Sequence, residues 1–208
     1  MKAYLLLYNF SQLLCNGSLF IFCLLYGPIL FYNNPKVELI FKFSQTFMIL
    51  EIVHSLIKIS PSPFIPTLMQ VISRVWVVFG VMDLARDSFW IFMVGLMWSM
   101  AEIIRYSHYI AMLFKKTPKS LLWARYSGFI ILYPVGVFSE LRVLYDAYPV
   151  IERCCPRVFS FEMPNEWNIS FDYMYAIWIM AIPGYVFGFP FLYSYMLSQR
   201  KRKLSKLD

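Results

Sequence analysis

Six long, predominantly apolar runs occupy most of the chain, and they restrict the fold more than any other feature of its sequence. Each run is long enough to cross roughly 30 Å of hydrocarbon as a helix that rises about 1.5 Å per residue. Lipid admits only helices and closed barrels, and long runs that do not alternate in polarity are unsuited to barrel strands. The sequence therefore predicts an all-α membrane protein, a bundle of six transmembrane helices. The predicted spans are approximately Tyr4–Tyr26, Leu39–Ile59, Ile65–Met82, Phe89–Leu113, Leu121–Leu144 and Phe171–Leu197.

The connections between these runs are short, except for the fifth, which covers about residues 145–170. No internal repeat, linker or low-complexity stretch divides the chain. Residues 1–208 are therefore predicted to form a single domain that ends in a basic tail over about residues 198–208.

The composition excludes most soluble classes of protein. Hydrophobic residues make up 60% of the chain and charged residues 15%, whereas soluble domains average about 25% charged. The net charge of +7 does not predict a nucleic-acid partner, because most Lys and Arg residues lie at the ends of apolar runs and not along one polar face. Membrane lipid is the expected surrounding.

The distribution of Lys and Arg predicts the orientation of the bundle, because basic residues are retained on the cytosolic side. With six spans both termini share one side, which would hold 11 basic residues against 6 on the other. Both termini are therefore predicted to be cytosolic. The 11 residues are Lys2, Lys58, Lys115, Lys116, Lys119, Arg125, Arg200, Lys201, Arg202, Lys203 and Lys206.

Six ionisable residues lie well inside the predicted spans, where each costs about 2.5–3.5 kcal/mol on insertion scales and so needs a partner or a function. Glu51, His54 and Lys58 follow helical spacing, which predicts a buried polar seam on one face of the second span. Glu102 and Arg105 are one turn apart and are expected to form an ion pair. Arg74 either completes that network or meets an anionic headgroup. The six residues are Glu51, His54, Arg74, Glu102, Arg105 and Glu140.

The fifth span holds a tyrosine and a carboxylate on one helical face. Tyr133 and Glu140 are seven residues apart, close to two turns, so both can face one cavity. Pro134 is expected to kink the helix between them, and Gly128 and Gly136 give a neighbouring backbone or a ligand close access. Geometry alone indicates an acid/base pair as one reading. The other reading is that Tyr133 packs and that Glu140 pairs with an arginine.

Several motifs, in order from the second span to the last, resemble the very-long-chain (3R)-3-hydroxyacyl-CoA dehydratases, a family also called protein tyrosine phosphatase-like. The motifs are Leu-Glu-Ile-Val-His-Ser at 50–55, Gln-Val-Ile-Ser-Arg-Val at 70–75, Ala-Glu-Ile-Ile-Arg-Tyr-Ser at 101–107, Trp-Ala-Arg-Tyr at 123–126, Leu-Tyr-Pro-Val-Gly-Val-Phe-Ser-Glu-Leu at 132–141 and Phe-Asp-Tyr at 171–173.

The resemblance implies a hydro-lyase of the endoplasmic reticulum membrane that carries out the third step of fatty acid elongation. Its substrate would be a long-chain 3-hydroxyacyl-CoA, which loses water to give the trans-2-enoyl-CoA. The resemblance implies no cofactor and no metal. Other elongation enzymes, the condensing enzyme and the reductases, are the expected partners.

The resemblance also implies roles for individual residues. Tyr133 and Glu140 match the family's catalytic pair, and Arg125 and Gly136 match its supporting residues. Elimination needs removal of the C2 proton and protonation of the departing hydroxyl, which two acid/base groups can supply. Glu140 at the C2 proton and Tyr133 at the hydroxyl is the preferred assignment, and the reverse stays open.

Other basic residues are candidates for supporting roles. Arg74 and Arg105 are expected to support the active site from neighbouring spans. The phosphates of coenzyme A would bind cations, which are expected at the cytosolic end of the helix that bears Tyr133. Lys115, Lys116, Lys119 and Arg125 are candidate contacts for them, although membrane orientation alone also explains these residues.

Three alternatives compete with a dehydratase. A catalytically silent family member could act as a membrane scaffold for elongation enzymes, and the intramembrane ionisable residues could suit a transporter, although paired broken helices are not evident. The third, an iron-dependent desaturase or hydroxylase, is disfavoured because His54 and His108 are the only histidines and oxygen-activating membrane sites need several. No phosphatase activity is expected, because a cysteine phosphatase would need a thiolate where this chain has Ser55 and an arginine where it has Pro61. Asn168 begins a glycosylation sequon, expected to be mostly unmodified because it abuts the sixth span.

Overall fold

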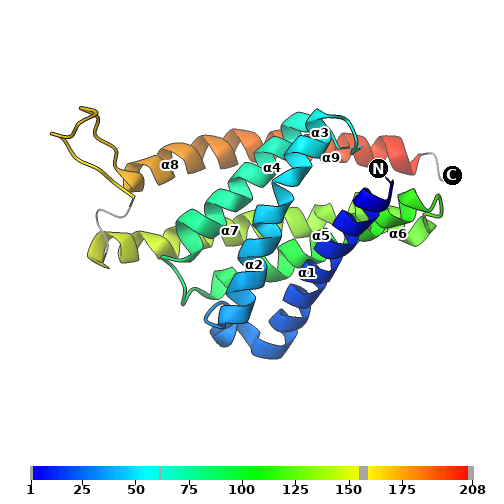
Figure 1. Cartoon of the computed structure of the whole chain (residues 1–208), viewed down its shortest axis with the longest axis horizontal. Coiled ribbons are helices and arrows are strands. Elements are labelled where there is room, and N and C mark those ends of the chain that lie inside the picture. The colour runs from blue at the N-terminus through cyan, green and yellow to red at the C-terminus, as the bar shows by residue number, and fades with distance from the viewer. Residues whose placement is uncertain (1, 61, 155–158, 206–208) are drawn as a thin grey trace.

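The computed structural model describes residues 2–60, 62–154 and 159–205. Apart from one isolated bridge between Phe161 and Phe171, the regular structure in these residues is helical, and the elements form an elongated bundle (Figure 1). This confirms the all-α prediction. Six stretches are long and apolar enough to cross a membrane, as predicted: Lys2–Pro28, Pro35–Leu56, Phe64–Met82, Phe89–Leu113, Lys119–Arg153 and Tyr173–Leu204.

The first two spans meet at a tight turn. Helix α1 (Lys2–Leu30) bends at Gly27, whose φ of 61° is a conformation that glycine adopts readily. Helix α2 (Pro35–Met48) begins after Asn34, whose side chain accepts a hydrogen bond from the backbone of Lys36. Helix α3 (Leu50–Leu56) then completes the second span.

The end of α3 corrects one expectation. Lys58 lies beyond the last helical residue, in a left-handed conformation with φ of 58°, and its side chain is exposed. The prediction that Lys58 shares a helical face with Glu51 and His54 is therefore wrong, because the helix stops at Leu56.

The third and fourth spans form the middle of the bundle. Helix α4 (Phe64–Trp76) continues directly into the π-helix η1 (Val77–Met82), and α5 (Phe89–Leu113) follows after a short connection. Four residues of η1 are buried among the core side chains. The carbonyl of Gly80 in η1 accepts a hydrogen bond of 2.8 Å from the Tyr173 hydroxyl, which fastens this span to the sixth.

The fifth span consists of two helices, α6 (Lys119–Ser127) and α7 (Phe129–Cys154). The interruption lies at Gly128, whereas a kink was predicted at Pro134; α7 is one continuous helix through that proline. Glycine has poor helix propensity, and an added Cβ at Gly128 would lie 2.8 Å from the carbonyl of Ala124. Pro134 removes the hydrogen bond that its backbone nitrogen would make to the carbonyl of Ile130, yet the helix continues on both sides of it.

Helix α7 also extends ten residues beyond the predicted end of its span, which shortens the fifth connection. The extension continues the buried stripe of the helix, because Ala147 and Ile151 are four residues apart and both are buried. The fifth connection is still the longest between spans, as predicted, but its predicted start at 145 is wrong because α7 continues to Cys154.

The sixth span runs through α8 (Tyr173–Pro183), the π-helix η2 (Gly184–Gly188) and α9 (Phe189–Leu204). The basic residues 200–203 lie on the last turns of α9, and residues 206–208 of the predicted tail lie outside the described residues. Both termini lie at the same end of the bundle, and the loop before α8 lies at the opposite end (Figure 1).

The core lies where α1 and α7 pack on α5, with Leu19, Phe41, Val94 and Ala147 among its buried residues. Large apolar side chains also cover the outside of the bundle. Leu25, for example, is 70% exposed. Such an apolar outer surface is unfavourable in water and favourable in contact with lipid. The chain is a multi-pass membrane protein.

Candidate active site

A cavity of about 1010 Å³ lies between α4, α5, α6, α7 and the η2–α9 segment. It brings together six of the residues that the sequence singled out, from three separate spans. They are Arg74, Arg105, Arg125, Tyr133, Gly136 and Glu140.

Glu140 is buried in the wall of this cavity and is held by two neutral donors. The indole nitrogen of Trp98 donates to Oε1 of Glu140 at 2.9 Å, and the Tyr185 hydroxyl donates to Oε2 at 2.8 Å. None of the ion pairs between described residues includes Glu140. The alternative in which Glu140 serves only to pair with an arginine therefore has no support in the geometry.

Tyr133 lines the same cavity, about two helical turns before Glu140 on α7. Its ring stacks on Phe189 of α9, with centroids 5.2 Å apart and planes 9° apart, and Tyr193 continues the stack. The stack fixes the ring, and no described residue forms a hydrogen bond with the Tyr133 hydroxyl. A ligand in the cavity can therefore form a hydrogen bond with that hydroxyl.

The arginines inside the spans form a buried ion network. Arg74 pairs with Glu102, and Arg105 contacts Glu102 at 2.7 Å and Glu51 at 2.9 Å. Tyr106 adds a 2.6 Å hydrogen bond to Glu51. The expected pairing of Glu102 with Arg105 is confirmed, and Arg74 completes the network.

Arg74 also links this network to Glu140. Its guanidinium lies over the indole ring of Trp98, 4.6 Å from the centroid, and that indole donates to Glu140. A cation over an aromatic face is held by the ring's negative potential. Arg74 therefore acts on the carboxylate through Trp98, whereas Arg105 is one step further away.

The polar seam predicted for the second span is confirmed for two of its three members. Glu51 meets Arg105 and Tyr106 of α5, and His54 forms a 2.8 Å hydrogen bond with the Tyr4 hydroxyl of α1. These two residues therefore join the second span to two neighbouring helices.

Gly136 lies where α7 comes close to α5. A Cβ added there would lie 3.8 Å from Cβ of Met97 and 4.0 Å from the Trp98 ring. A larger side chain at this position would press on the indole that holds Glu140.

The remaining candidates differ in position. Arg125 of α6 lines the cavity, and α6 lies at the same end of the bundle as the last turns of α9 (Figure 1). Lys115, Lys116 and Lys119 are exposed and are not among the residues that line it. A contact of these lysines with coenzyme A phosphates stays a prediction.

Sequence reasoning missed several lining residues. Trp98 could have been found, because it precedes Glu102 by one turn and so shares its face of α5. Tyr185 left no such signal, since its direction depends on the π-helical winding of η2. Other missed lining residues include His108, Gln199, Arg202 and Lys203.

Comparison with known proteins identifies the family. A family model described as "Protein tyrosine phosphatase-like protein, PTPLA" matches residues 45–206. Very-long-chain (3R)-3-hydroxyacyl-CoA dehydratase 1 of Canis lupus familiaris is 40% identical over 174 residues, which are 81% of this chain and 68% of that protein. Dehydratase 2 of Homo sapiens is 39% identical over 178 residues, 83% of this chain and 68% of that protein.

A plant relative is equally similar. Very-long-chain (3R)-3-hydroxyacyl-CoA dehydratase PASTICCINO 2B of Oryza sativa subsp. japonica is 41% identical over 177 residues, which are 82% of this chain and 77% of that protein. No solved structure matches the chain significantly.

Proposed function

The chain belongs to the protein tyrosine phosphatase-like family, PTPLA, and from this premise we infer that it is a very-long-chain (3R)-3-hydroxyacyl-CoA dehydratase. It is a hydro-lyase that removes water from a 3-hydroxyacyl-CoA to give the trans-2-enoyl-CoA, the third step of fatty acid elongation. The observation that supports this activity best is Glu140, a buried carboxyl group that two neutral donors hold in the same cavity as the Tyr133 hydroxyl.

We assign the two proton-transfer roles from the hydrogen bonds of Glu140. Both of its oxygens accept from a donor, and an indole N–H can only donate, so the site suits an ionised carboxylate. Glu140 takes the proton from C2, and the electrons of that C–H bond form the C2–C3 double bond. The C3–O bond breaks, and Tyr133 donates its proton to the departing hydroxyl, which leaves as water. The proton on Glu140 then returns to Tyr133 before the next turnover.

The other predicted residues take supporting roles in this scheme. Arg74 fixes Trp98, and Arg105 holds Glu102, the carboxylate that anchors Arg74. Gly136 lies beside Met97 and Trp98 in the wall of the cavity. Arg125 supports the site from the end of the cavity nearer the termini.

The cavity also suits the acyl chain of the substrate. Much of its lining is apolar, with Met69, Met97, Val137 and Leu192 as examples. Burial of each methylene in such a lining contributes about 0.8 kcal/mol, so a long chain is favoured over a short one.

The cellular setting follows from the same inference. We place the protein in the endoplasmic reticulum membrane with both termini cytosolic, where the residues around 115–125 and the end of α9 give one end of the bundle its positive charge. The condensing enzyme and the reductases of elongation are the proposed partners, because they supply its substrate and consume its product.

The test is an assay of the purified protein in detergent with a long-chain 3-hydroxyacyl-CoA. Formation of the trans-2-enoyl-CoA by monodisperse protein supports the proposal. Absence of product from folded protein would instead favour the catalytically silent scaffold, which predicts binding to elongation enzymes without turnover.

A further inference from the structure

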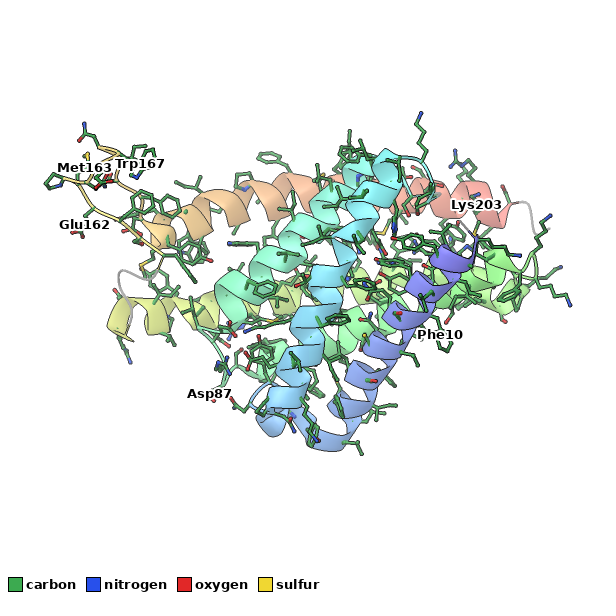
Figure 2. The ribbon with its side chains drawn as sticks, in the orientation of Figure 1. Phe10, Asp87, Glu162, Met163, Trp167 and Lys203 are labelled. Carbon is green, nitrogen blue, oxygen red and sulfur yellow. The ribbon has the colours of Figure 1, made fainter. Side chains whose placement is uncertain are left out.

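One end of the large cavity carries cations that no described carboxylate neutralises. Arg125 of α6 and Arg202 and Lys203 of α9 all line it there, and none of the ion pairs between described residues includes them. Lys203 lies at the same end of the bundle as the C-terminus (Figure 2). These three residues are called the α6–α9 cation group below.

The two other arginines that line the cavity are already balanced by carboxylates. Arg74 and Arg105 are matched by Glu102 and Glu51, and Glu140 is held by neutral donors. The α6–α9 cation group therefore adds an excess of positive charge at one exposed end of the cavity, where it attracts an anion.

A buried histidine next to this group has a free ring nitrogen. His108 of α5 is 4% exposed and lines the cavity, and its Nδ1 has no hydrogen-bond partner. The charged groups that act on it are Arg125 and Lys203, both cations. An unpaired polar atom buried among cations is costly unless a ligand supplies the acceptor.

The two helices that carry the group are fastened to each other. Arg200 of α9 donates to the buried Ser127 of α6 at 3.2 Å, and Arg202 donates to Gln199 at 2.7 Å. The end of α9 is thus held against α6, and this contact keeps the cations at the end of the cavity.

We propose that Arg125, Arg202, Lys203 and His108 bind the phosphates of coenzyme A, the 3′-phosphate and the pyrophosphate of its nucleotide. This inference rests on the proposed function, since it places the nucleotide of the acyl-CoA at this end and its thioester between Tyr133 and Glu140. Guanidinium and ammonium groups are the ordinary partners of phosphate.

The spacing along the fifth span fits that arrangement. Arg125 precedes Tyr133 by eight residues and Glu140 by fifteen, or about 12 Å and 22 Å along an ideal helix. A pantetheine arm extended beside α7 joins phosphates at Arg125 to a thioester in this interval. An anionic lipid headgroup offers similar phosphate chemistry, but the cation group opens into the cavity that holds Glu140, which favours the substrate.

The test compares a 3-hydroxyacyl-CoA with the 3-hydroxyacyl-pantetheine thioester, which has the same reacting atoms and no phosphates. The double variant Arg202→Gln/Lys203→Gln alters exposed positions near the end of α9, so the bundle should fold. We expect its KM for the CoA thioester to rise about tenfold, as loss of charge-assisted contacts implies. Its KM for the pantetheine thioester should equal that of the wild type.

Two further variants make the comparison specific. Lys36→Gln/Arg153→Gln removes the same charge from exposed residues outside the cavity and should change neither KM. Lys115→Gln/Lys116→Gln tests the lysines that the sequence suggested. If this variant raises the KM for the CoA thioester and the α9 variant does not, the inference is overturned.

A binding measurement separates this inference from the dehydratase activity. Adenosine 3′,5′-bisphosphate should bind wild-type protein in phosphatidylcholine nanodiscs by calorimetry, about tenfold more weakly to Arg202→Gln/Lys203→Gln. Such binding without any enoyl product would sink the proposed function and leave the phosphate site standing. No nucleotide binding, together with stabilisation by phosphatidylglycerol that the variant loses, would show a lipid site and overturn the inference.

Discussion

The indole of Trp98 joins Glu140 to Arg74: its nitrogen lies 2.9 Å from Oε1 of the carboxylate, and its face lies 4.6 Å below the guanidinium. Three spans meet in this contact, because Arg74 belongs to α4, Trp98 to α5 and Glu140 to α7. The orientation of the carboxylate is therefore set by side chains of neighbouring helices.

Removal of either proposed proton-transfer group, Tyr133 or Glu140, should abolish most of the turnover. Tyr133→Phe keeps the stacked ring, and Glu140→Gln keeps the shape of the side chain, so neither creates a cavity. Each should lower kcat by about 10²-fold or more, and the double variant should be little worse than the poorer single, because groups that act as a unit are not additive.

The measurement is enoyl-CoA formation per molecule of monodisperse, folded protein. A purely structural Glu140 would give the opposite pattern, a lower folded yield with normal specific activity of the surviving protein. Near wild-type kcat in either single variant would falsify the role of that residue.

Loss of one donor to Glu140 should have a smaller effect than loss of the carboxylate itself. Tyr185→Phe and Trp98→Phe each remove one hydrogen bond to Glu140, and each should lower kcat about tenfold with little change in KM, consistent with one charge-assisted hydrogen bond. Tyr175→Phe is the matched control, because Tyr175 is 72% exposed on α8. Equal losses in kcat for Tyr175→Phe and Tyr185→Phe would reject the positioning role.

The buried ion network should matter for stability more than an exposed one. Arg105→Gln leaves Glu51 without a cation and leaves Glu102 paired with Arg74 alone. The free energy of unfolding should therefore fall by about 3–5 kcal/mol. Arg86, whose side chain is 41% exposed beside Glu38, provides the comparison: Arg86→Gln should cost at most about 1 kcal/mol. Thermal unfolding in one detergent measures both, and similar shifts in Tm would contradict the prediction.

The contact between η1 and α8 leaves no room for a side chain at Gly80. A Cβ there would lie 2.2 Å from the Tyr173 hydroxyl oxygen, so Gly80→Ala should lower Tm by forcing the two spans apart. Tyr173→Phe removes that oxygen, and the double variant should be more stable than Gly80→Ala alone. The same Tm for the double variant and Gly80→Ala would show that another contact sets the limit.

The orientation of the bundle can be tested in sealed microsomes. A tag placed after Asp208 should be digested by added protease, because the basic residues predict a cytosolic C-terminus. A second tag in the loop before α8, at the opposite end of the bundle (Figure 1), should be protected. Protection of the first tag and digestion of the second would reverse the orientation.

The spans and part of the site could be predicted because their signals are local. Lipid imposes apolar runs of a fixed length. The spacing of three residues between Glu102 and Arg105 predicts their ion pair. The partners of Glu140 could not be predicted in this way: Trp98 is 42 residues away and Tyr185 is 45 residues away. Such contacts depend on how whole helices pack, which spacing within one helix does not reveal.

The errors were also local in origin. Lys58 has helical spacing from Glu51, but the helix stops two residues before it. The tail residues Arg202 and Lys203 were counted only as orientation charges, although the end of α9 turns them into the cavity. Charge counting takes no account of which face of a helix a residue occupies.

The π-helix η2 sets how α9 is turned relative to α8. Five residues, Gly184–Gly188, wind more widely there than an α-helix would. If the same five residues wound as an α-helix, the residue that the wider winding accommodates would turn all of α9 by about 100° relative to α8. Phe189 would then leave the ring of Tyr133, and Lys203 would leave the cavity in the same step. The aromatic stack on Tyr133 and the cation near the far end of α9 are therefore aligned together by the winding of one short segment.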